Sequence, residues 1–297
     1  MSKIILLGAA GQLGQALCHQ LNAAGLAFTG YTRQTLDITN ANDLAKLFSQ
    51  QAPQFIINCA AYTAVDLAET HKEQCWAINT LAVANLAKHC QAHDTVLLHF
   101  STDYVFDGQK STPYTEEDQP NPLNQYGLSK WAGEQAIQQS QCAHYIIRTS
   151  WLYSDYGKNF YTTMRQFAQQ NRAVQVVDDQ IGGPTHANNL ALVVLNILLQ
   201  HSEQQHMLNK HTLQKHRFQK PHPQSPTSPK VLAYGLYHYC DQPYLSWYQF
   251  AQQIYQAQQA TALVSPISSQ QYGIAAKRPA NSRLNCQLLQ TWLNNLP

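Results

Sequence analysis

A tyrosine and a lysine, Tyr126 and Lys130, lie four positions apart in this sequence. On a helix, this spacing places both side chains on one face. A phenol has a reference pKa of about 10, so it needs a nearby cation to transfer a proton efficiently near neutral pH. Of the 16 tyrosines, only Tyr126 is followed by a lysine four positions later. The pair therefore predicts a general acid, although an ordinary amphipathic helix could also carry it.

A glycine-rich turn near the start of the chain decides between these two interpretations. Gly8, Gly11 and Gly14 follow the apolar run 3–7, and the stretch 12–24, which contains Gly14, has apolar residues at helical spacing. Glycines between a strand and a helix let the backbone approach a pyrophosphate, which the helix N-terminus stabilises. The turn predicts a dinucleotide site, and with the Tyr–Lys pair it indicates a nicotinamide-dependent reductase.

The choice of cofactor depends on the end of the second expected strand, near residue 31. An acidic residue there would bind a ribose hydroxyl and favour NAD. This chain has Thr32 and Arg33, and its nearest acid, Asp37, comes later. Because Arg33 could pair with a 2′-phosphate, NADPH is the preferred cofactor. NADH is the alternative, since a solvated surface arginine would also suit this position.

Thr102 follows an expected strand over 96–101. Residues at this place gather above the carboxyl edge of a parallel sheet, where the hydroxyl could donate to a carbonyl oxygen while Tyr126 protonates it. A simple capping hydroxyl fits the same position equally well.

Strands alternating with helical stretches predict an α/β fold. We expect a Rossmann-like doubly wound parallel sheet with a smaller C-terminal α/β substrate lobe. The expected dinucleotide-binding domain is 1–150, with contributions from 162–200 and 231–241, and the expected substrate lobe comprises 151–161 and 242–297.

Residues 201–230 differ from the rest in being rich in Gln, His, Lys and Pro. They hold five basic residues and one acidic residue, whereas the whole chain has a net charge of +2. The basic excess is therefore not spread over the folded body, and we expect no nucleic-acid partner. Histidines recur there every five residues, which is not the spacing of metal ligands on one helix face. We interpret the segment as a mobile insertion and expect no metal site.

The seven cysteines are an odd number without a Cys-x-x-Cys pair, so a disulfide framework or zinc knuckle is not expected. The first apolar run is too short for a signal peptide, and 190–199 is about half a membrane span. These observations favour a cytoplasmic protein without a membrane partner.

Longer motifs carry a family resemblance over nearly the whole chain except 201–230. They are Gly-Ala-Ala-Gly-Gln-Leu-Gly (8–14), Leu-Asp-Ile-Thr (36–39), Asn-Cys-Ala-Ala-Tyr-Thr-Ala-Val-Asp-x-Ala-Glu (58–69), Ser-Thr-Asp-Tyr-Val-Phe-Asp-Gly (101–108), Pro-Leu-Asn-Gln-Tyr-Gly-x-Ser-Lys-x-Ala-Gly-Glu (122–134), Arg-Thr-Ser-Trp-Leu-Tyr (148–153), Gly-Lys-Asn-Phe (157–160), Asp-Gln-x-Gly-x-Pro-Thr (179–185) and Arg-Pro-Ala-Asn-Ser (278–282). Together they resemble the dTDP-4-dehydrorhamnose reductase family of the extended short-chain dehydrogenase/reductase superfamily.

The resemblance implies roles for individual residues. Catalysis is assigned to Thr102, Tyr126 and Lys130. Cofactor contacts are implied, or expected from the glycine turn and the second strand, for Gly8, Gly11, Gln12, Leu13, Gly14, Arg33, Asp37, Ile38, Ala60, Ala61, Tyr62, Asn79, Tyr126 and Lys130. Substrate contacts are implied for Thr63, Val65, Thr102, Tyr104, Trp151 and Arg278, although Trp151 could also be a core aromatic residue.

The implied reaction is reduction of dTDP-4-dehydro-L-rhamnose at C4 by NADPH, the last step of dTDP-L-rhamnose synthesis. Another dTDP-4-keto-6-deoxy sugar as substrate, or a non-catalytic regulatory subunit, are the alternatives. Some members of the family dimerise around magnesium, but here Gln15, Asn188 and Asn189 occupy the corresponding positions. Neutral amides bind a divalent ion poorly, so we expect a monomer or a weak homodimer without magnesium.

Overall fold

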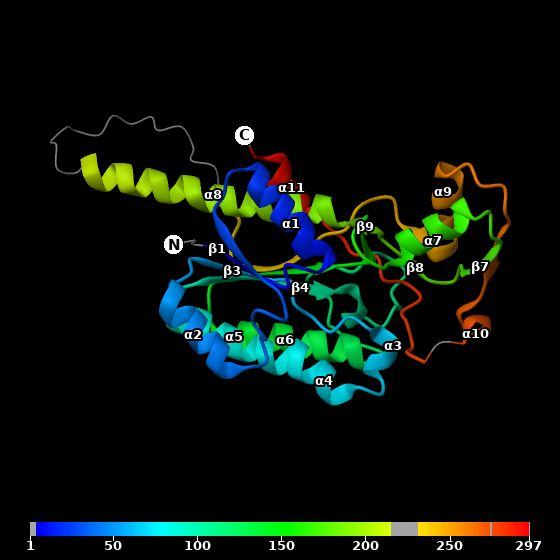
Figure 1. Cartoon of the computed structure of the whole chain (residues 1–297), viewed down its shortest axis with the longest axis horizontal. Helices are drawn as coiled ribbons and strands as arrows, with labels where there is room; N and C mark the ends of the chain where they lie inside the picture. The colour runs from blue at the N-terminus through cyan, green and yellow to red at the C-terminus, as the bar shows by residue number, and fades with distance from the viewer. Residues whose placement is uncertain (1–3, 215–230, 274, 297) are drawn as a thin grey trace.

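One six-stranded parallel sheet forms the centre of the molecule (Figure 1). This computed structural model describes residues 4–214, 231–273 and 275–296. The neighbouring strands are, in order, β2 (Phe28–Tyr31), β1 (Ile4–Leu7), β3 (Phe55–Asn58), β4 (Val96–Thr102), β5 (His144–Thr149) and β10 (Gly235–His238). The chain order changes direction between β1 and β3, and ligands of doubly wound sheets bind above the carboxyl ends of strands at such a point.

Helices cover both faces of the sheet, so β1, β3 and β4 are buried along their whole length. On one face lie α1 (Gln12–Ala23), α8 (Ala187–Gln214) and α11 (Gln287–Asn294). On the other lie α2 (Ala41–Gln51), α5 (Ala82–Ala92) and α6 (Gln125–Ser140). Shorter helical segments lie in the connections between these elements: α3 (Val65–Ala68), α4 (Lys72–Trp76), the π-helix η1 (Ala77–Leu81) and the 3₁₀ helix η2 (Asp103–Val105). The predicted Rossmann-like α/β fold is confirmed.

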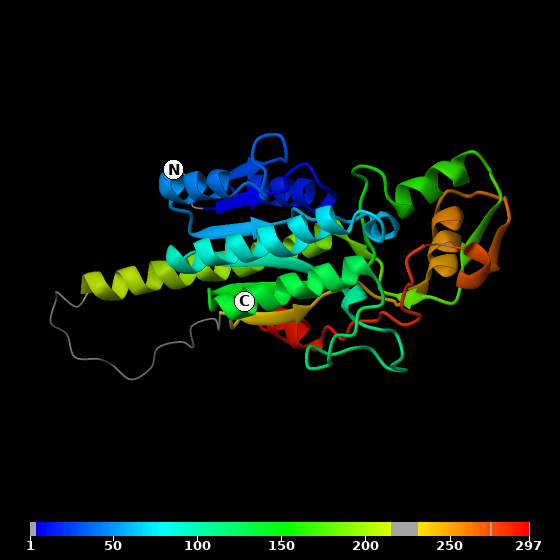
Figure 2. The same ribbon diagram turned by 90° about the horizontal axis from the view of Figure 1, so that it is seen from below.

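A smaller lobe stands beyond one end of the sheet (Figure 2). Its apolar core lies between α7 (Phe160–Gln169), α9 (Trp247–Ala257) and the parallel pair β7 (Val174–Val177) and β12 (Val264–Ile267), with α10 (Ser269–Tyr272) following β12. Two short pairs connect the lobe to the body: β6 (Leu152–Tyr153) with β9 (Thr185–His186), and β8 (Ile181–Gly182) with β11 (Leu245–Ser246).

The packing differs from the expected division of the chain at two places. Residues 162–200 were expected in the dinucleotide-binding domain, yet Met164 of α7 and Val176 of β7 belong to the core of the smaller lobe. Conversely, 242–297 was expected in the lobe, yet Leu289 of α11 is buried in the core of the larger domain. The chain crosses between the two parts more often than local patterns indicate.

Residues 201–214, which we interpreted as part of a mobile insertion over 201–230, are helical. They continue α8, and the ring Nε2 of His201 lies 2.7 Å from the hydroxyl of Tyr145 on β5. The Gln- and His-rich composition hides the helix because apolar periodicity stops near residue 198. The remaining part of the expected insertion, 215–230, lies outside the described residues.

Candidate active site

A cavity of about 930 Å³ lies between the sheet and the smaller lobe. Its wall includes the glycine turn after β1, the segment after β3, the end of β4 and the start of α6. The opposite wall comes from the lobe, including Phe160 and Trp247. The cavity therefore occupies the place where a doubly wound sheet binds its ligand.

The glycines shape this wall of the cavity. Gly8 has a φ of +77°, and a Cβ there would lie 2.7 Å from the backbone nitrogen of Ala60. A Cβ on Gly14 would lie 2.2 Å from the carbonyl oxygen of Gly8. Gly11, the N-cap of α1, lines the cavity and carries no side chain that could satisfy the first backbone N–H groups of the helix. The turn thus presents open helix-terminal donors to the cavity, which suits an anion.

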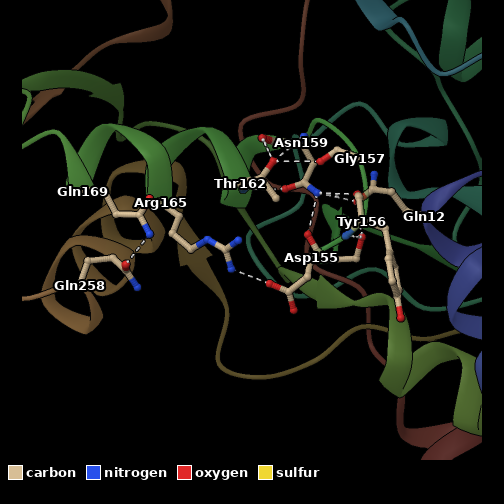
Figure 3. A network of polar contacts seen from close by, with 10 residues as sticks. Gln12, Asp155, Tyr156, Gly157, Asn159, Thr162, Arg165, Gln169 and Gln258 are labelled. Atoms are coloured by element: carbon tan, nitrogen blue, oxygen red, sulfur yellow. Dashed lines mark hydrogen bonds and ion pairs between the residues drawn. The ribbon is translucent and has the colours of Figure 1, made fainter.

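Gln12 connects the glycine turn to the smaller lobe (Figure 3). Its Oε1 accepts hydrogen bonds from Ser154 Oγ at 3.0 Å and Asn159 Nδ2 at 2.8 Å. Asn159 also caps α7 through a reciprocal pair of bonds with Thr162. Although Gln12 lines the cavity as expected of a cofactor contact, its side-chain oxygen is already used to hold the loop before α7.

Thr102 and Tyr126 meet at the floor of the cavity. Both side chains line it, and the Thr102 hydroxyl donates to Asp103 Oδ1 at 3.0 Å. The backbone N–H of Tyr104 donates to Thr102 Oγ1 at 3.1 Å. The Thr102 hydroxyl therefore has both roles considered for it: it caps a turn and it lies in the site. Burial raises the pKa of Tyr126, against a smaller opposing effect of the nearby Thr102 hydroxyl. The phenol is therefore protonated at neutral pH.

Asp103 is a site residue that sequence reasoning missed. It is 2% exposed and lines the cavity next to Thr102. Burial raises the pKa of its carboxyl to about 7, although the hydrogen bond from Thr102 and the nearby Ser282 act in the opposite direction. Its position directly after Thr102 was the available signal, but an acid at a strand end is common on solvated loops.

Lys130 lies on α6 one turn beyond Tyr126 and is 2% exposed. Its Nζ donates to the carbonyl oxygen of Phe100 at 2.6 Å and lies 3.2 Å from Nε2 of His99. Burial lowers the pKa of Lys130 to about 8, against a smaller opposing effect of Glu134. The helical spacing in the sequence thus brings the pair to one cavity, with the amino group of Lys130 directed at β4.

The residues expected to contact cofactor fall into three groups. Those that line the cavity are Gly11, Gln12, Leu13, Gly14, Ala61, Tyr126 and Lys130. Gly8, Ala60, Tyr62 and Asn79 lie behind this wall: Gly8 packs on Ala60, and Asn79 holds both backbone groups of Tyr62, through bonds of 2.8 and 3.0 Å.

Arg33, Asp37 and Ile38 form the third group, which does not line the described cavity. Arg33 is exposed just past the end of β2, and Ile38 is buried in the core. The carboxylate of Asp37 accepts from the backbone and hydroxyl of Thr39, and these bonds, with a smaller effect of Arg33, lower its pKa. Arg33 therefore remains available for a group bound beside β2.

All residues expected to contact substrate line the cavity: Thr63, Val65, Thr102, Tyr104, Trp151 and Arg278. Tyr104 meets the ring of Tyr126 edge-on, with centroids 6.1 Å apart, and Arg278 donates to Asp66 at 2.8 Å. Trp151 stacks on Trp247 with centroids 3.6 Å apart. The sequence identified only the first member of this stacked pair, because Trp247 lies outside the quoted motifs.

Within the described ranges, no group of three or more His, Cys, Asp or Glu side chains could hold a metal ion. Gln15 and Asn189, two of the amides considered in the sequence as replacements for magnesium ligands, donate to the backbone of Ala10 and the carboxylate of Asp241. None of the helices in this part of the chain is long and apolar enough to cross a membrane. All seven cysteines are free thiols.

Comparison with known proteins agrees with the geometry. The family model described as RmlD substrate binding domain matches residues 2–221 and 223–296, so it includes much of the segment that we had placed outside the resemblance. The dTDP-4-dehydrorhamnose reductase of Aggregatibacter actinomycetemcomitans is 35% identical over 98% of this chain and 92% of its own length. The Escherichia coli protein of the same name is 33% identical over 97% of this chain and 90% of its own.

A crystal structure of dTDP-4-dehydrorhamnose reductase from Bacillus anthracis in complex with NADP superposes with a TM-score of 0.81. It is 33% identical, and the match covers 99% of this chain and 97% of that one. The resemblance inferred from the motifs is confirmed: the chain belongs to the dTDP-4-dehydrorhamnose reductase family, whose model is that of the RmlD substrate binding domain.

Proposed function

We propose that this protein uses NADPH to reduce the C4 keto group of dTDP-4-dehydro-β-L-rhamnose to dTDP-β-L-rhamnose, the last step of dTDP-L-rhamnose biosynthesis. One observation carries the proposal: Thr102, Tyr126 and Lys130 line the same cavity as the glycine turn. The names of the relatives and the NADP in the Bacillus anthracis structure support it.

The residues fit a dinucleotide. The N-terminus of α1 offers backbone N–H groups to a pyrophosphate, and the bare Cα of Gly11 leaves room for its approach. The cofactor supplies the hydride. The expected contacts with dinucleotide of Gly8, Gln12, Leu13, Gly14, Ala60, Ala61, Tyr62, Asn79, Asp37 and Ile38 are part of the same proposal.

The protein supplies orientation and a proton. Tyr126, kept protonated by its raised pKa, gives its proton to the oxygen at C4, and Thr102 polarises the carbonyl when its hydroxyl turns from Asp103 Oδ1 to that oxygen. When Lys130 carries its charge, it stabilises the phenolate that remains. Thr63, Val65, Tyr104, Trp151 and Arg278 line the part of the cavity in which the nucleotide-sugar would lie.

We expect purified protein to oxidise NADPH when it is given dTDP-4-dehydro-L-rhamnose and not when it is given dTDP-glucose, which lacks the keto group. The measurement is loss of nicotinamide absorbance, followed by NMR analysis of the product. A product with the other C4 configuration would replace dTDP-β-L-rhamnose by its C4 epimer as the product of this enzyme. Binding without any product would instead favour the regulatory subunit.

Replacing Arg33 by alanine should weaken the preference for NADPH over NADH by about 5- to 10-fold, because an exposed charged hydrogen bond contributes about 1 kcal/mol. The ratio of kcat/KM for the two cofactors measures this preference. Arg172→Ala is the matched control, since Arg172 is an exposed arginine in the loop between α7 and β7. An unchanged ratio in Arg33→Ala would remove Arg33 from the cofactor site.

A further inference from the structure

A buried hydrogen-bond chain runs from the backbone of Ala60 to the side chain of Lys130. The N–H of Ala60 lies 3.1 Å from Asn58 Oδ1, and Asn58 Nδ2 lies 3.1 Å from Nδ1 of His99. The other ring nitrogen of His99, Nε2, lies 3.2 Å from Lys130 Nζ. Asn58, His99 and Lys130 are 1%, 0% and 2% exposed. Because solvent does not reach these side chains, the hydrogen bonds between them determine which atoms carry protons.

The proton positions follow from one fixed donor. A backbone N–H can only donate, so the amide oxygen of Asn58 must face Ala60 and its NH₂ must face His99. Since that NH₂ donates to Nδ1 of His99, Nδ1 carries no proton. Burial, and the nearby Lys130, lower the pKa of His99 well below its usual value, so the ring is neutral. Its single proton must be on Nε2.

This tautomer has a consequence for Lys130. His99 Nε2–H points at Lys130 Nζ, and two donors facing each other at 3.2 Å would repel. A neutral amine has a lone pair that can accept this bond while its own N–H donates to Phe100. We propose that Asn58 fixes the Nε2–H tautomer of His99, and that His99 thereby stabilises the uncharged amine of Lys130 in the nucleotide-free protein.

The other titratable groups near Lys130 do not shift the balance between its charged and uncharged forms. The thiols of Cys59 after β3 and Cys75 on α4 have pKa values raised mainly by burial, so they are uncharged. Glu134, one turn further along α6, is ion-paired with Arg148 at 2.6 Å. The pKa of Lys130 itself, about 8, agrees with easy loss of its proton.

His99 is thus a positioning residue that acts through Lys130, and this role rests on the proposed reduction. If turnover needs the charged lysine beside Tyr126, activity falls as pH rises through the pKa of Lys130. Stabilising the amine lowers that pKa and brings the alkaline limit of activity closer to neutral pH. Dinucleotide binding to the charged form would then take up a proton.

The first test needs no turnover. In protein labelled with ¹⁵N-histidine, NMR correlates the ring nitrogens with the ring protons and identifies the tautomer of each of the 13 histidines. The signal that disappears in His99→Gln belongs to His99. We expect Nε2 protonated and Nδ1 unprotonated, without titration between pH 5 and 9. A proton on Nδ1 would overturn the proposal whatever the substrate proves to be.

The second test follows Lys130. In His99→Gln the amide can turn its oxygen toward Lys130, and in Asn58→Leu the His99 ring is free to take the Nδ1–H tautomer. Both changes favour the ammonium and should raise the Lys130 pKa by about half to one unit, the size of one hydrogen bond.

The readouts are the ¹⁵Nζ signal of Lys130 in nucleotide-free protein, assigned with Lys130→Met, and the alkaline limb of kcat/KM. A lower kcat with both readouts unmoved would reduce His99 to a packing residue. A shifted NMR titration without sugar turnover would keep this proposal and reject the proposed substrate.

Discussion

Tyr126→Phe should lower kcat by about 10²- to 10⁴-fold, the usual contribution of a positioned general acid. The phenylalanine ring fills the same space between Tyr104 and Thr102, so the cavity keeps its shape and only the proton is lost. Dissociation constants for NADPH should stay within about 3-fold, since the glycine turn is untouched. Stopped-flow measurement of NADPH oxidation and fluorescence titration of the cofactor separate the two effects.

The pH profile offers a second observable for the same residue. The raised pKa of Tyr126 keeps the acid protonated throughout the neutral range, so ionisation of the free phenol should not limit activity there. Tyr248→Phe is the matched control, because its hydroxyl only accepts a bond from Gln252 on the surface of α9. Turnover in Tyr126→Phe equal to that of Tyr248→Phe would exclude the proton-donor role.

Local patterns predicted the elements on which the candidate site stands. The Tyr126–Lys130 spacing and the strand–glycine–helix order each depend on neighbours in sequence, and the structure has both in the expected form. The end of β4 placed Thr102 at the sheet edge for the same reason. Fold class and much of the cavity floor could therefore be derived without knowing any long-range contact.

Sequence patterns did not predict the features that depend on contacts between residues far apart in the chain. The pKa of Asp103 is raised by its burial in the folded chain, and Trp247 reaches Trp151 across nearly a hundred residues. The lobe membership of α7 likewise depends on α9, which follows much later in the chain. Periodicity and local motifs carry no information about contacts between distant residues, so these features could not be predicted from them.

The helix that holds Tyr126 and Lys130 is anchored by a buried ion pair. Arg148 on β5 donates to both carboxylate oxygens of Glu134 on α6, at 2.6 and 2.9 Å, and the two side chains are 4% and 2% exposed. Arg148→Leu should lower the free energy of unfolding by about 3–5 kcal/mol, because it leaves a carboxylate buried without a cation. Urea denaturation at pH 7 measures this loss.

The loss in free energy of unfolding caused by Arg148→Leu should be smaller when Glu134 is also replaced or protonated. Glu134→Leu combined with Arg148→Leu leaves no uncompensated charge, so the double variant should be more stable than Arg148→Leu alone. Lowering the pH should narrow the gap between Arg148→Leu and the unaltered protein, as the stranded carboxyl gains a proton. Arg165→Leu is the control: its pair with Asp155 is equally short at 2.7 Å but 36% and 60% exposed, so about 0–1 kcal/mol is expected. If Arg148→Leu costs no more than this control, burial of the pair does not hold α6 against the sheet.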